Sequence, residues 1–261
     1  METSASPSRL WRWLLPVAVA ACLYVNYIYN AHPPTGALSN GAMSARHPTL
    51  LTPAGYAFSI WGVIFSGLVA YTVWQLRPKS WQTPLPARLT PVLTLAVLAT
   101  TSWTLAFSYE LIGLSLLVML IILVLLALAY ARTRPLVLTG AAPAWPTWFL
   151  SLYLGWIMLA TVLNMIFGLR DALGWQWPAE AVLPGSLLLA VLAATIALLL
   201  AWRARDPLLP LPVAWGLVGA WVAQHGPLPD VVFSAMGASL APVLAMPVAA
   251  WLARRRPRRT R

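Results

Sequence analysis

Residues 111–131 read LIGLSLLVMLIILVLLALAYA and contain no charged residue. A helix needs about 20 predominantly apolar residues to cross the hydrocarbon core of a bilayer, so this stretch predicts a membrane-spanning helix. The whole chain has the same character, because 60% of its 261 residues are hydrophobic and 9% are charged. A soluble domain carries roughly 25% charged residues. The composition therefore excludes a water-soluble globule and predicts an all-α, polytopic membrane protein.

Other charge-free stretches predict further spanning helices once turn residues and prolines are trimmed from their ends. We expect about eight, at 11–29, 54–76, 90–108, 112–131, 147–169, 183–203, 211–224 and 231–253. The seventh is short for a span, so it either crosses with little tilt, thins the bilayer locally or re-enters without crossing. The pairs Gly62-x-x-x-Ser66 and Gly216-x-x-x-Ala220 place small residues one turn apart, which allows close helix packing.

The distribution of positive charge supports an even number of spans. With eight helices and both termini on one face, every Lys and Arg except Arg46 and Arg170 lies on that face or in its tails. Cytoplasmic loops carry the excess of Lys and Arg. We therefore expect an integral protein of a bacterial cytoplasmic (inner) membrane with both termini in the cytoplasm. The arginine-rich tail at 254–261 is expected to contact anionic lipid headgroups rather than nucleic acid.

The N-terminal segment allows two interpretations. Val19-Ala20-Ala21-Cys22 follows an arginine-bearing start and an apolar run, as a lipoprotein cleavage site does. The apolar segment continues through Leu23–Ile28, which favours its retention as the first helix. As Cys22 is the single cysteine, no internal disulfide can form.

The ionisable residues give little support for an enzyme or a metal site. No charged residue falls near a predicted midplane, which argues against a proton pump or a carboxylate-based ion carrier. His32, His47 and His225 are expected on one face, but their spacing matches no metal motif. The sequence shows no nucleophile–base pair and no paired carboxylates, so we expect neither catalytic nor metal-binding residues.

Tryptophan is unusually frequent, with fifteen residues. Most fall near the predicted membrane interfaces, where an indole buries its ring and keeps its N–H hydrated. Trp61 and Trp156 instead lie deep inside their helices, where each N–H needs an internal partner such as Asn26 or Asn164. Such residues suit a flat, apolar ligand, or they fill a protein core with large side chains. Composition alone leaves both interpretations open.

Three motifs resemble the TspO/MBR family, also called translocator proteins or tryptophan-rich sensory proteins. His47-Pro48 and Pro53 followed by Ile60-Trp61-Gly62-Val63-Ile64-Phe65 resemble the entry to that family's second helix. Ser102-Trp103 resembles its third-helix Asn-Trp pair. The most specific match is to its fifth helix, where Tyr153-Leu154-Gly155-Trp156 is followed by Ala160-Thr161-Val162-Leu163-Asn164.

The resemblance implies a five-helix bundle over residues 11–171 that binds porphyrins, sterols or other hydrophobic ligands under a loop that follows the first helix. Residues 1–10 would then form an N-terminal tail and 172–253 a three-helix extension. Met165 replaces the tyrosine of the family's sterol-recognition motif, so sterol binding by that motif is not supported. The ligand-binding residues expected from the resemblance and from the need to pair buried indoles are Trp61, Trp156, Ala160, Asn164, Pro48, Pro53, Ser102, Trp103 and Asn26.

We therefore expect a membrane sensor or translocator that binds a hydrophobic, porphyrin-like molecule, with porphyrin or haem as ligand. The alternative is a transporter or channel for a small solute that uses the extra C-terminal helices. Its motivation is the short helix at 211–224 and the sequence Gln224-His225-Gly226, because broken helices often line substrate sites. An enzyme acting on a tetrapyrrole or a lipid has the weakest support. We also keep a homodimer as a candidate assembly.

Overall fold

A computed structural model describes residues 9–172, 174–175, 178–226, 229–230, 233–234 and 237 of the chain. Within them the chain is helical, as predicted. The α-helices are α1 (Arg9–Ala31), α2 (Asn40–Arg46), α3 (Ile60–Gln75), α4 (Leu85–Ser108), α5 (Ile112–Leu138), α6 (Trp148–Phe167), α7 (Ala179–Ala204) and α8 (Leu211–Ala223). The short helical segments are η1 (Gly55–Ser59), η2 (Pro78–Gln82), η3 (Trp145–Thr147) and the π-helical η4 (Gly168–Ala172).

Six helical segments are long and apolar enough to cross a membrane, which confirms the first six predicted spans. They are Leu10–Ala31, Gly55–Gln75, Leu85–Ser108, Ile112–Leu138, Trp145–Asp171 and Ala181–Ala204. The seventh predicted span corresponds to α8, which is apolar but has only 13 residues. The eighth predicted span, 231–253, lies almost entirely outside the described residues, and so does the arginine-rich tail.

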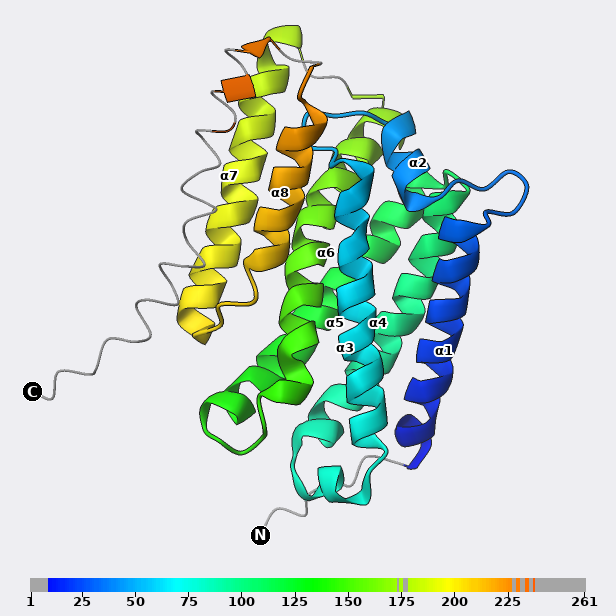
Figure 1. Ribbon diagram of the computed structural model, residues 1–261, viewed down its shortest axis with the longest axis vertical. Coiled ribbons are helices and arrows are strands. Elements are labelled where there is room, and N and C mark those ends of the chain that lie inside the picture. The colour runs from blue at the N-terminus through cyan, green and yellow to red at the C-terminus, as the bar shows by residue number, and fades with distance from the viewer. Residues whose placement is uncertain are drawn as a thin grey trace, which may run out of the picture.

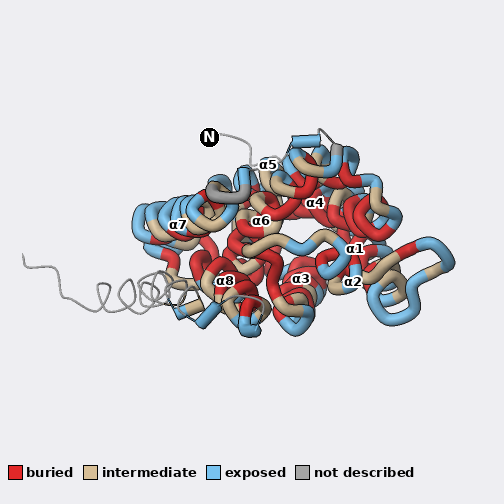
Figure 2. Tube along the Cα trace, turned by 90° about the horizontal axis from the view of Figure 1, so that it is seen from above, coloured by how far each residue is buried: buried red, intermediate tan, exposed pale blue. Residues whose placement is uncertain are grey.

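The long helices run side by side, with α1 at one edge of the bundle and α7 at the opposite edge (Figure 1). Viewed along the helices, α6 lies in the interior and the exposed residues follow the rim (Figure 2). Successive helices run in alternating directions, so the connections alternate between the two ends of the bundle. Residues 32–59, residues 109–111 and the described residues of the α6–α7 connection share one end, which we call the lid end.

The segment 47–59, which we call the lid, is held against α8. Ala54 N donates to Gly219 O at 3.0 Å, and the indole Nε1 of Trp215 donates to Ala57 O at 2.9 Å. Gln224 Nε2 lies 3.4 Å from Thr49 O. The C-terminal helix α8 therefore supports the lid in addition to packing on α6.

Close helix packing occurs at only one of the two predicted small-residue pairs. A methyl group added at Gly216 would overlap the side chain of Leu159 on α6, which confirms a close approach there. Gly62 is exposed and a methyl group there would meet no atom within 4 Å, so that half of the prediction was wrong. Gly155 on α6, which the pattern did not single out, lies directly against the backbone carbonyl of Leu209.

We expect Gly155→Ala to destabilise the protein by about 1–3 kcal/mol, because its methyl group would force α6 away from a backbone atom that has little freedom to move. Thermal unfolding in detergent measures the effect. Gly62→Ala is the matched control, and it should be neutral or slightly stabilising because alanine favours a helix. Equal effects of the two substitutions would contradict this account of the α6–α8 contact.

A buried carboxylate connects several elements at the end of the bundle opposite the lid end. Asp206, between α7 and α8, is 2% exposed and accepts hydrogen bonds from Ser151 Oγ at 2.6 Å and Tyr130 Oη at 2.9 Å. Its Oδ2 lies 3.5 Å from Arg134 Nη1, and its Oδ1 accepts from Leu208 N at 3.1 Å. Asp206 therefore connects the start of α8 to α5 and α6.

Candidate functional site

A small cavity of about 20 Å³ lies in the bundle between the lid and the helices α3, α4 and α6. Half of its lining residues are aromatic. The lining residues are Ser44, Pro53, Phe58, Trp61, Trp103, Phe107, Trp156, Leu159, Ala160, Leu163, Asn164 and Phe167. We call this the aromatic cavity.

Six of the nine predicted ligand-binding residues line the aromatic cavity. They are Pro53, Trp61, Trp103, Trp156, Ala160 and Asn164. The last three share one face of α6 because residues four apart in a helix project in nearly the same direction. The motif in α6 therefore predicts the direction of these side chains correctly, toward the interior of the bundle.

The indoles of the cavity are held by aromatic neighbours. The Trp61 ring meets the Tyr153 ring edge to face with centroids 5.6 Å apart, and it stacks on Phe65 at 5.1 Å. Phe58 of the lid meets the Trp156 ring edge to face at 6.0 Å. Such pairs contribute about 0.5–1.5 kcal/mol each beyond the area that they bury. The Phe58–Trp156 contact therefore stabilises the lid against α6, and the Trp61–Tyr153 contact joins α3 to α6.

Asn164 is one of the two polar residues that line the cavity, the other being Ser44. Its Oδ1 accepts from Trp103 Nε1 and from Ser115 Oγ, both at 3.3 Å, and its Nδ2 donates to Ala160 O at 3.0 Å. The indole that it pairs is therefore that of Trp103, whereas the sequence suggested Trp61 or Trp156.

The other three predicted residues lie elsewhere. Ser102 is exposed on the outer surface of α4, where its Oγ donates to Leu98 O at 3.1 Å. Its direction differs from that of Trp103 by about 100°, and here this turns it away from the cavity. Asn26 is buried, but its Oδ1 accepts from Thr104 Oγ1 at 3.3 Å, so it joins α1 to α4. Pro48 lines a second cavity.

The prediction missed several cavity residues, above all Phe107 and Phe167. Phe107 follows Trp103 by four residues, and the two rings stack with centroids 4.8 Å apart. Phe167 follows Asn164 by three residues on the same helix. Helical spacing from the known motif residues would have identified both as members of the same face.

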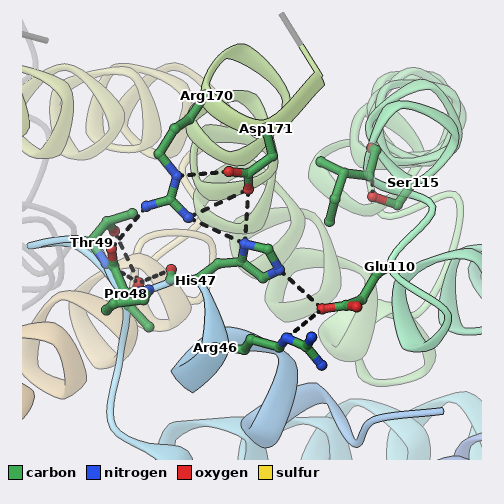
Figure 3. Close-up of polar contacts among 10 residues, drawn as sticks. Arg46, His47, Pro48, Thr49, Glu110, Ser115, Arg170 and Asp171 are labelled. Atoms are coloured by element: carbon green, nitrogen blue, oxygen red, sulfur yellow. Dashed lines mark hydrogen bonds and ion pairs between the residues drawn. The ribbon is translucent and has the colours of Figure 1, made fainter. Parts of the chain in front are cut away.

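Four charged side chains gather around His47, which lies directly after α2 (Figure 3). His47 Nδ1 lies 2.8 Å from Asp171 Oδ2, and its Nε2 lies 3.4 Å from Glu110 Oε1. Arg46 Nε pairs with the same Glu110 oxygen at 2.9 Å, and Arg170 Nε pairs with Asp171 Oδ1 at 2.9 Å. We call these five residues the polar cluster.

Both ring nitrogens of His47 have polar partners. Nε2 faces the Glu110 carboxylate, and Nδ1 faces both the Asp171 carboxylate and Arg170 Nη2, which lies 3.2 Å away. Glu110 comes from the α4–α5 turn and Asp171 from η4, so His47 ties the start of the lid to two other elements.

The polar cluster and the aromatic cavity are adjacent. The His47 ring lies 5.8 Å from the Phe167 ring, and Phe167 stacks on Phe107 with centroids 6.4 Å apart. Arg170 Nη1 also donates to the lid carbonyl of Pro48 at 3.2 Å. The cluster therefore fixes the lid next to the cavity that the lid covers.

The three histidines have different surroundings. His32 packs edge to face on Tyr27 and His225 on Phe233, with centroids 5.7 and 5.2 Å apart, respectively. Only His47 contacts carboxylates in the part of the chain that the structure describes. Among those residues, no three His, Cys, Asp or Glu side chains are grouped as a metal site would require.

A comparison with protein-family models matches residues 12–248 to the family described as TSPO-like protein. The match includes α7 and α8 as well as the helices that carry the aromatic cavity. No functionally curated protein and no solved structure matches the chain. Because the match covers most of the sequence and agrees with the motifs of α3, α4 and α6, the chain belongs to the TSPO-like protein family.

Proposed function

We propose that this membrane protein binds a hydrophobic, planar, porphyrin-like ligand in the aromatic cavity and acts as a sensor or translocator for it. The observation that carries the proposal is the convergence of Trp61, Trp103, Trp156 and Asn164 in one cavity beneath the lid. Flat aromatic walls suit a flat apolar ligand, and the Asn164 carboxamide and Trp103 N–H offer a polar contact.

Binding requires the cavity to open. Sites for drug-sized ligands have volumes of about 300–1,000 Å³, whereas the aromatic cavity holds about 20 Å³. The lid contributes Pro53 and Phe58 to its wall, and movement of the lid would remove both. We infer that the structure is the closed state of a two-state protein, and that ligand binding favours the open state or an expanded closed one.

We further propose that the lid end faces away from the cytoplasm. Arg46 and Arg170 lie at this end, whereas most Lys and Arg residues fall in α1, the opposite loops and the tails. This asymmetry is the one that the positive-inside rule describes. The protein would then receive its ligand from the non-cytoplasmic side or from the adjoining leaflet.

The contacts of α8 favour binding over solute transport. Gln224, which motivated the transport hypothesis, is buried and lies against the lid carbonyl of Thr49. Gly219 and Trp215 contact the lid as well. Supporting the lid gives α8 a role in the proposed binding function without a solute pathway.

The test is a titration of the protein, in lipid nanodiscs, with protoporphyrin IX. Binding is measured as the shift of the porphyrin absorption band. We expect saturable binding to the native chain and at least about tenfold weaker binding to Ala160→Leu, equivalent to 1.4 kcal/mol, because the larger side chain projects into the cavity. Met165→Leu changes a lipid-exposed position one turn further along α6 and should bind like the native chain.

Two controls make the result decisive. Thermal unfolding establishes that Ala160→Leu is folded, and a flat, uncharged dye of similar size tests whether shape alone suffices. Non-saturable binding, or equal affinity of the two variants, would contradict the proposed site.

A further inference from the structure

A second cavity, of about 250 Å³, lies between the lid, α6 and α7. Its apolar wall is formed by Leu50 of the lid, Ile166 of α6, and Val182 and Leu189 of α7. Val182 and Leu189 are seven residues apart and therefore lie on one face of their helix. We call this space the lateral cavity.

The lateral cavity is separate from the aromatic cavity, and the two have no lining residue in common. Consecutive residues of α6 divide between them, because Phe167 lines the aromatic cavity and Ile166 lines the lateral one. The lid contributes to both cavities in the same way, because Pro53 lines the aromatic cavity and Pro48 lines the lateral cavity. The lateral cavity also needs α7, which lies outside the five-helix region.

One end of the lateral cavity is polar. Arg170 is the charged residue among those that line it, and Ser186 adds a hydroxyl group. The guanidinium has five N–H donors, and Arg170 pairs with Asp171 and donates to Pro48 O. Asp171 is not among the lining residues, and no carboxylate lines the cavity among the residues that the structure describes.

The polarity of the lateral cavity follows the expected depth in the membrane. Arg170 and Trp175 belong to the α6–α7 connection, and both residue types favour the interface between headgroups and hydrocarbon. A helix rises 1.5 Å per residue, so Leu189 lies about 10 Å further along α7 than Val182. The lateral cavity thus runs from a cationic, interfacial end into an apolar end.

We propose that the lateral cavity binds a single-chain anionic amphiphile from the surrounding leaflet, with its carboxylate at Arg170 and its chain between the lid, α6 and α7. The charge of Arg170 selects the anionic head, since charge-assisted hydrogen bonds to guanidinium are strong. The volume is below the range of about 300–1,000 Å³ for drug-sized ligands, so one chain fits better than a tetrapyrrole or a two-chain lipid. The site does not depend on the function proposed for the aromatic cavity.

The test uses two single-residue variants, Leu189→Cys and Leu188→Cys, in phosphatidylcholine nanodiscs. Leu189 lines the lateral cavity, whereas its neighbour Leu188 is 58% exposed on the lipid side of α7. The native Cys22 is buried, so the unmodified chain measures the background reaction with a membrane-permeant maleimide. Oleate should slow the labelling of Leu189→Cys in a saturable way and leave Leu188→Cys unchanged.

The role of the head group is tested with ligands that share the oleyl chain and differ in the head group. Oleyl alcohol and oleylamine should need at least about tenfold higher concentrations than oleate for equal protection, equivalent to 1.4 kcal/mol. Combining Leu189→Cys with Arg170→Gln should remove this preference, and Arg170→Lys should retain part of it. Should the Arg170 variants fail to fold, the head-group series on Leu189→Cys decides the question alone.

Three results would overturn the proposal. They are equal protection of both cysteines, equal potency of oleate and oleyl alcohol, and the absence of protection by oleate. Protection by phosphatidylglycerol at the same concentration as oleate would exclude the single-chain assignment.

Discussion

Replacement of Asp206 by alanine is expected to lower the free energy of unfolding by about 3–5 kcal/mol, the range for breaking a buried ion pair by removing one partner. Ser151, Tyr130 and Arg134 all direct donors at this carboxylate. Without it, Ser151, Tyr130 and Arg134 each lose one hydrogen-bond or ion-pair partner at a buried junction. Since Asp206 also orders the start of α8, we expect the C-terminal helices to loosen first.

Two matched variants test whether the effect comes from the negative charge of Asp206 and whether it is specific to this position. Asp206→Asn keeps one acceptor oxygen and should give an intermediate loss. Asp230→Ala removes an exposed carboxylate and should leave stability unchanged within about 0.5 kcal/mol. Thermal unfolding in one detergent compares all three, and a loss for Asp206→Ala no greater than for Asp230→Ala would show that the network is not stabilising.

The substitution His47→Ala should accelerate both association and dissociation of protoporphyrin IX by about tenfold, equivalent to 1.4 kcal/mol of lost lid stabilisation. His47 contacts Asp171 and Glu110 through its two ring nitrogens, so its removal frees the lid from η4 and the α4–α5 turn. The equilibrium affinity should change less than either rate, because the aromatic cavity itself is intact. Stopped-flow measurement of porphyrin fluorescence gives both rates.

Arg46→Gln is the control for this effect. Arg46 belongs to the same cluster, but its side chain is 61% exposed. Exposed ion pairs contribute only about 0–1 kcal/mol, so its loss should change the rates much less. If His47→Ala left both rates unchanged, or changed the dissociation rate alone and so the affinity, the lid would not control access to the site.

The spans were predictable because the thickness of a bilayer sets their length. The motif of α6 also predicted side-chain direction, since Trp156, Ala160 and Asn164 follow the helical period. The Ser102-Trp103 pair shows the limit of the motif, because Trp103 lines the aromatic cavity whereas Ser102 lies on the outer surface of α4.

The polar cluster and the lid contacts could not be predicted from local sequence. His47 and Asp171 are more than a hundred positions apart, and only the tertiary fold brings the residue that follows α2 to η4. The same holds for Asp206, which meets Ser151 and Tyr130 through the folding back of α8. Cavity volume is also a tertiary property, which a local motif does not determine.

A structure of the protein saturated with protoporphyrin IX tests the central proposal most directly. We expect the tetrapyrrole ring to lie against Trp61, Trp103 and Trp156, with the lid and Phe58 displaced from the positions that they occupy here. A ring bound on the lipid-facing surface or between α6 and α7, with the aromatic cavity still closed at about 20 Å³, would contradict it.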